Sequence, residues 1–171
     1  MVKLNTKNLA KQKGTSLIEV LLYIALFAII IVPISYFIPA ISEAKAKNVA
    51  ISEVDQQGLQ VSRLITQTIR NSKAVNYPLQ GGSANQLSLG AEVISPTTFE
   101  ISDGVLEIRE NGNINILTSP QVVSSNLVFF NYSAANTPGT VRFQFTLSYK
   151  NTLGRQEYDY SKTFLGSASL R

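Results

Sequence analysis

The chain has 171 residues and a formal net charge of +4, and it contains neither cysteine nor histidine. The missing cysteines exclude disulfides, thiolate metal sites and cysteine nucleophiles, and the missing histidines remove the commonest general base. The composition therefore argues against an enzyme, and the length suits one ordinary domain plus an anchor.

Positive charge is concentrated at the start of the chain. Residues 1–14 carry no acidic side chain, and their basic residues are Lys3, Lys7, Lys11 and Lys13. The 11 basic and 11 acidic residues that follow balance one another. The basic pI thus belongs to this leader, and no basic stripe on the rest of the chain indicates nucleic acid as a partner.

The next segment, residues 15–41, is predicted to be a transmembrane helix. From residue 17 onward it is almost entirely Leu, Ile, Val, Ala and Phe, and about 20 such residues span a bilayer core. The preceding lysines place the N-terminus in the cytoplasm and the rest of the chain outside. Because proline removes a helical hydrogen bond, we expect a kinked or looser helix from Pro33 to Pro39.

Residues 42–75 are predicted to form an amphipathic helix. Apolar side chains recur at intervals of three, four and seven, at Val54, Val61, Leu64, Ile65 and Ile69. Gly58 should weaken this helix slightly. A stretch rich in glycine, with Pro78, ends it.

Residues 76–171 are predicted to form an antiparallel β domain. Asp103-Gly104 and Asn111-Gly112 are type I′ hairpin turns by composition, and each lies between alternating apolar runs. Further strands are expected in three segments, residues 126–133, 140–150 and 155–170. The side chains expected to face the core in the two hairpins are Phe99, Ile101, Val105 or Leu106, Ile108, Ile114 and Ile116. The fold class is therefore α+β, with the apolar stripe of the helix packed on the sheet.

The apolar run raises one chemical question, because it contains a carboxylate, Glu19. A charge within a membrane costs roughly 2.5 kcal/mol or more, less near the interface. Neither an uncleaved signal anchor nor an ordinary secretory signal peptide explains it. A cut between Gly14 and Thr15 would, because the new α-amino group would lie about one helical turn from Glu19. That amine could pair with Glu19 of the same chain or of a neighbouring subunit.

The stretch KGTSLIEVLLYIALFAIIIV closely resembles the class III signal and N-terminal helix of type IV prepilins and type II secretion pseudopilins. The matching features are a short basic leader, Gly14 at the cut, glutamate fifth in the mature chain and an unbroken apolar helix. The long second helix and the sheet agree with that family in outline. Threonine replaces the usual phenylalanine at the first mature position, and the cysteine pair of many major pilins is missing.

The resemblance implies how the chain would be processed and assembled. A prepilin peptidase of the membrane would cut after Gly14 and N-methylate Thr15. An assembly ATPase and a platform membrane protein would then load the subunit from the membrane lipid into a filament at the periplasm or cell surface. There Glu19 would engage the N-terminal amine of another pilin or pseudopilin subunit. No cofactor is implied.

The C-terminal segments are similar in style to minor pilins and J-type minor pseudopilins, so the resemblance favours a minor, initiating or tip subunit. Two alternatives stay open. The chain could be a major pilin, or a single-pass binding module that is anchored at the surface and never polymerises.

Other features have plainer interpretations. Asp103, Glu107 and Asp159 lack the spacing of a calcium loop, so a hairpin is the better interpretation. Alternating tyrosines such as Tyr149, Tyr158 and Tyr160 are more often packing residues than a binding platform. Lys45 and Lys47 could contact lipid headgroups, or simply occupy an exposed helix face.

Overall fold

The computed structural model describes residues 16–90, 96–134, 139–152 and 154–171. In this part of the chain one long helix precedes two antiparallel β-sheets, which confirms the predicted α+β class. The helix, α1, comprises Leu17–Asn71 and has 55 residues. The chain divides into two compact units, Met1–Ser42 and Glu43–Arg171. The boundary therefore falls inside α1, next to the predicted end of the transmembrane segment.

In the first unit, α1 continues without interruption through Pro33 and Pro39. Each proline removes one backbone donor from the helix. Hydroxyl groups add bonds to nearby carbonyls: Ser35 Oγ donates to the Ile31 carbonyl at 2.9 Å and Ser42 Oγ to the Ile38 carbonyl at 3.1 Å. The helix is thus not broken beyond Val32, and a bend at the prolines stays a prediction.

In the second unit, α1 ends at Asn71, four residues before the predicted boundary, because Val75 already belongs to strand β1. Its buried positions recur every three or four residues, at Ala50, Val54, Gly58, Val61, Ile65 and Ile69. This confirms the predicted apolar stripe. Leu64, which was expected to belong to it, is only partly buried.

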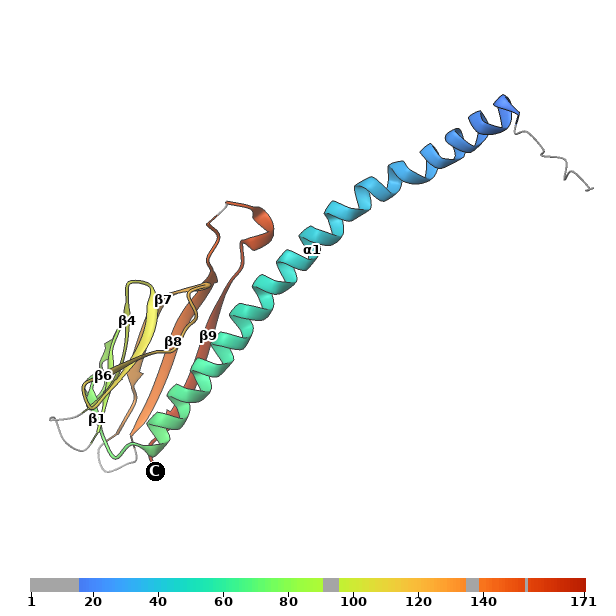
Figure 1. The fold of residues 1–171 in the computed structure, drawn as a ribbon. Helices are drawn as coiled ribbons and strands as arrows, with labels where there is room; N and C mark the ends of the chain where they lie inside the picture. The colour runs from blue at the N-terminus through green and yellow to red at the C-terminus, as the bar shows by residue number, and fades with distance from the viewer. Residues whose placement is uncertain (1–15, 91–95, 135–138, 153) are drawn as a thin grey trace, which may run out of the picture. The chain divides into compact units, whose positions relative to one another are not determined.

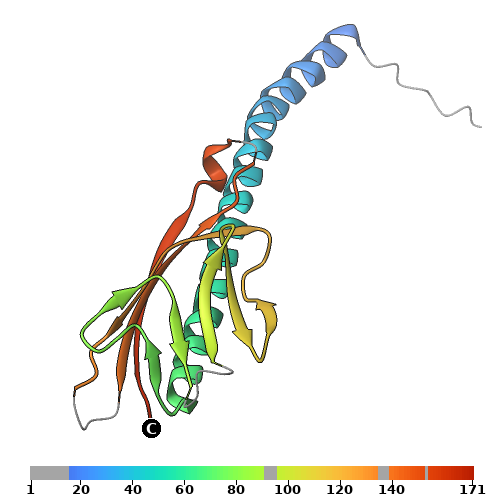
Figure 2. The same cartoon turned by 90° about the vertical axis from the view of Figure 1, so that its left-hand side faces the viewer.

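The strands divide between two sheets, which the sequence did not distinguish (Figures 1 and 2). The first has the order β1-β3-β4-β5-β6, with the bounds Val75–Tyr77, Leu87–Leu89, Thr97–Ser102, Val105–Glu110 and Asn113–Ile116. The second has the order β2-β7-β8-β9, with the bounds Ser83–Ala84, Val122–Asn131, Thr140–Tyr149 and Ser161–Ser169. A single 3₁₀ turn, η1 (Gln156–Tyr158), lies between β8 and β9. The short strands β1, β2 and β3 were not predicted.

Both predicted hairpin turns are confirmed. Asp103 and Gly104 have φ values of 51° and 76°, and Asn111 and Gly112 have φ values of 52° and 81°. Two successive positive φ values are the signature of a type I′ turn. The turns join β4 to β5 and β5 to β6 with Ser102 opposite Val105 and Glu110 opposite Asn113.

The expectation that Ile114 and Ile116 face the core is wrong. Their side chains are 52% and 68% exposed. The two-residue turn sets the register, so Ile114 lies opposite Arg109 and Ile116 opposite Glu107. Residues opposite each other lie on the same face of a sheet, so both isoleucines share the face of Arg109 and Glu107. The buried Ile108 points to the other face, where its partner on β6 is Asn115.

A single hydrophobic core joins α1 to both sheets. The helix residues in this core run from Val54 to Ile69, and this stretch is called the packed half of α1. On β8, as predicted, the apolar side chains of the alternating pattern are buried, with Val141, Phe143, Phe145 and Leu147 fully inaccessible. The Phe145 and Phe164 rings stack with centroids 5.4 Å apart. Figure 1 shows this part of α1 running beside β8 and β9, and Lys162 Nζ on β9 bonds to Asp55 Oδ1 on α1 at 2.9 Å.

Candidate functional site

The apolar half of α1 is the most unusual surface of the chain. Every residue from 16 to 45 is exposed, although this stretch includes the longest run of Leu, Ile and Phe. An 18-residue window within α1 reaches a mean hydropathy of 2.8, and by length and composition this helix could cross a membrane. A helix that is apolar all round needs lipid or other helices around it. The candidate site is therefore a helix surface suited to contact lipid or other helices.

Glu19 lies in the first turn of α1. Among the described residues up to Ser42 it is the only charged side chain. The first backbone N–H groups of a helix have no helical partners, and its N-terminus carries a partial positive charge, which favours a carboxylate there. The position is thus electrostatically suited to a negative charge and, in the described part of the chain, has no cation opposite it.

Tyr23 is a site residue that the sequence reasoning missed. Its hydroxyl donates a hydrogen bond to Glu19 Oε1 at 3.0 Å. The signal was available, because side chains four residues apart face each other on a helix. Glu19 Oε2 has no hydrogen-bond partner within the described ranges, so one carboxylate oxygen is open to a further donor.

The remaining predicted site residues lie outside the described residues. They are the cleavage pair Gly14 and Thr15, the methylation site Thr15, and the leader lysines Lys3, Lys7, Lys11 and Lys13. Cleavage, methylation and the pairing of Glu19 with an amine therefore stay predictions.

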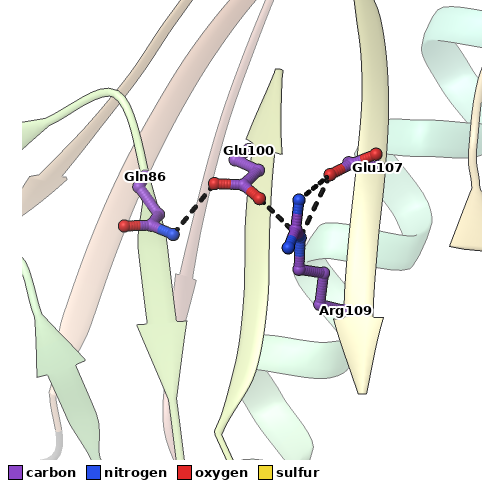
Figure 3. A network of polar contacts seen from close by, with 4 residues as sticks. All are labelled: Gln86, Glu100, Glu107 and Arg109. Carbon is purple, nitrogen blue, oxygen red and sulfur yellow. Dashed lines mark hydrogen bonds and ion pairs between the residues drawn. The ribbon is translucent and has the colours of Figure 1, made fainter. Parts of the chain in front are cut away.

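Two acidic residues of the hairpin strands, Glu100 and Glu107, bond to one arginine (Figure 3). Arg109 bonds to Glu107 at 2.7 Å and to Glu100 at 2.6 Å, and Gln86 donates to Glu100 at 3.1 Å. The hydrogen bond to Glu107, followed by the charges of both glutamates, raises the pKa of Arg109 above its ordinary value. No group of three or more acidic side chains in the described part of the chain could share a metal ion. Asp103 lies in the turn itself, as the hairpin interpretation requires.

The three tyrosines belong to the packing of the domain. Tyr149 and Tyr160 lie partly buried against the core. The Tyr149 and Tyr158 rings stack at 5.7 Å. The side chains of Lys45 and Lys47 are exposed, which fits either interpretation of them.

No family model matches the chain, and no curated protein or solved structure is similar enough to count as a match. What the structure does give is a pilin-like architecture: a long, apolar N-terminal helix whose second half packs on antiparallel sheets.

Proposed function

We propose that this chain is a prepilin-like subunit that assembles through α1 into a type IV pilus or a type II secretion pseudopilus, as a minor component. In this proposal it is cut after Gly14 and N-methylated at Thr15. One observation carries it: the apolar half of α1 is exposed on every side and has a single carboxylate, Glu19, in its first turn.

The carboxylate of Glu19 would find its partner through cleavage. A free amine made at Thr15 would supply the donor that the open oxygen of Glu19 lacks. Opposite charges attract strongly where water is excluded, and an unpaired one costs several kcal/mol. Packing of the apolar surfaces and pairing of these charges would therefore favour the same lateral assembly. Before assembly the same surface would be covered by membrane lipid.

Processing and assembly of the subunit would require other proteins. A prepilin peptidase that also methylates would process the chain on the cytoplasmic side, and an assembly ATPase with a platform membrane protein would insert it into the filament. The protein itself would act as a structural subunit without a cofactor and not as an enzyme. The rival function, a surface-anchored binding module, uses the same apolar helix but requires neither cleavage nor Glu19.

Processing is the first test. The chain is produced with and without a prepilin peptidase, and the intact mass of the purified product is measured. We expect the loss of residues 1–14 and the gain of one methyl group, and Gly14→Val should block both. An intact wild-type chain, or a cut near Ala40, would contradict the proposal.

Assembly is tested with Glu19→Ala. We expect processing to continue while incorporation into filaments falls more than about tenfold, because the amine of the neighbouring subunit loses its partner. Sheared filaments are quantified by immunoblot against the membrane fraction. Glu43→Ala is the matched control, since it removes the same charge from an exposed position of the same helix. Equal incorporation of the two variants would show that Glu19 does not act in assembly.

A further inference from the structure

A groove of about 600 Å³ lies between the packed half of α1 and strand β9. Its lining includes three arginines, Arg63 and Arg70 on α1 and the sequence-distant Arg171 beyond β9. Arg63 and Arg70 are seven residues apart, so they lie on one helix face, two turns from each other. No acidic side chain is among the described residues that line the groove.

Three basic residues of the same unit are neutralised by nearby carboxylates. Lys162, Arg109 and Arg155 each form an ion pair with a nearby carboxylate. Within the described ranges, none of the three groove arginines has such a partner. Arg70 lies in the last turn of α1, where a cation is favourable for the helix dipole, but this does not explain the other two. The groove therefore brings together three arginine side chains that pair with no acidic side chain of the described residues.

The groove also presents apolar surface. Leu59 and Leu165, which line it, are 52% and 58% exposed. A second hollow, also about 600 Å³, shares Leu59, Arg63 and Gln67 and continues along α1 to Gln56. The surface is thus elongated, and it combines aliphatic with cationic groups.

Strand β9 gives this surface a third property. It is the outermost strand of its sheet, and no strand in the described part of the chain pairs with its other edge. Such an edge offers a row of backbone N–H and C=O groups to an added strand. Arginine and aliphatic pockets beside a free edge are the features by which an extended peptide is bound.

We propose that the groove binds an extended acidic segment of a partner protein, which adds a strand to β9 and places its carboxylates against Arg63, Arg70 and Arg171. A peptide suits the surface better than a single-stranded nucleic acid. Nucleic acid would use the charge, but it binds through aromatic rings on which bases stack, and Phe143, the aromatic residue of the lining, is fully buried. The inference does not depend on filament assembly, because it concerns the isolated subunit.

Binding is tested on the full chain in nanodiscs of neutral lipid. The probe is an end-blocked peptide of alternating glutamate and valine that carries a fluorophore, and its anisotropy is measured at low salt. We expect binding, with an affinity that falls at least about tenfold in the double variant Arg63→Gln/Arg70→Gln, since two charge-assisted contacts are removed. The matched control is Lys45→Gln/Lys47→Gln, which removes two charges from exposed positions of the same helix and should change the affinity less than about twofold.

Hydrogen exchange then locates the peptide. Amides of β9 should become protected on binding, while those of β6, the edge of the other sheet, should not. Four results would overturn the proposal. They are the absence of peptide binding, an equal loss in the control variant, protection of β6 in place of β9, and binding of an oligothymidylate in the groove when the peptide does not bind.

Discussion

At the residue scale, Gly58 is a position where a missing side chain determines the packing. An alanine Cβ built there would lie 2.0 Å from Cζ of Phe164, which is far inside van der Waals contact. The Phe164 ring thus fills the space beside the helix backbone. The sequence identified this glycine only as a weak point of the helix, because its partner lies more than a hundred residues away.

The effect of this contact on stability can be measured by substituting Gly58 with alanine. Alanine should improve helix propensity by about 1 kcal/mol, but overpacking against Phe164 should cost about 1–3 kcal/mol. We therefore expect Gly58→Ala to lower the free energy of unfolding by up to about 2 kcal/mol in urea titrations. Gln60→Ala, at an exposed position of the same helix, is the control.

A double-mutant cycle gives the decisive outcome. In a Phe164→Ala background the ring is gone, so Gly58→Ala should no longer destabilise the protein. If alanine at position 58 costs the same with and without the ring, the clash is not the cause.

At the scale of elements, the hairpins were predictable because their signals are local. Asp103-Gly104 and Asn111-Gly112 fix both the turn and the register, and the sequence supplies both dipeptides. Counting residues from the Asn111-Gly112 turn places Ile114 opposite Arg109. Alternation alone does not tell which face of the sheet a residue occupies, so it predicted the wrong face for Ile114 and Ile116. Strands β1, β2 and β3 could not be found this way, because two or three residues carry no periodicity.

The attachment of β9 to α1 should depend on pH. The hydrogen bond from Lys162 to Asp55 raises the pKa of Lys162 above its ordinary value of 10.5. Because the folded-state pKa is above the unfolded one, this contribution is complete below about pH 10.5 and is lost as the pH rises through the folded-state pKa. The stability difference between wild type and Lys162→Met should therefore be constant from neutral pH to about pH 10 and shrink above it.

This prediction is checked by urea unfolding at a series of alkaline pH values. Lys73→Met, which removes an exposed lysine just after α1, is the control and should give a difference that is flat with pH. A difference for Lys162→Met that grows above pH 10 would contradict the assignment. Added salt should also reduce it, because the pair is exposed to solvent.

At the scale of the whole molecule, the two units differ in whether their apolar side chains are buried. Glu43–Arg171 has a continuous core from α1 and both sheets, whereas the helix before it exposes its apolar side chains. The helix-and-sheet class and the apolar span were predictable because both follow from periodicity and composition. The arginine groove was not, since it joins Arg63 and Arg70 to Arg171, and only the fold brings these positions together.

The division predicts how fragments behave. We expect residues 43–171 to fold as a monomer without detergent, with one cooperative thermal transition, whereas the full chain should require detergent or lipid. The matched fragment 72–171 lacks Val54, Val61, Ile65 and Ile69 and should aggregate, because its sheet would expose the surface that they cover. Size-exclusion chromatography and circular dichroism separate these outcomes, and a 43–171 fragment that aggregates would show that its core is not self-sufficient.

The contact between the helix and the last strand also sets an order of events during synthesis on the ribosome. Asp55 and Lys162 are separated by 107 positions, and at roughly 5–20 residues per second the second partner is made about 5–20 s after the first. The apolar span thus leaves the exit tunnel well before the helix beyond it can find its sheet. Insertion into the membrane would then precede folding, and stalled nascent chains should become resistant to protease only once β9 has emerged. A chain already resistant without β9 would reverse that order.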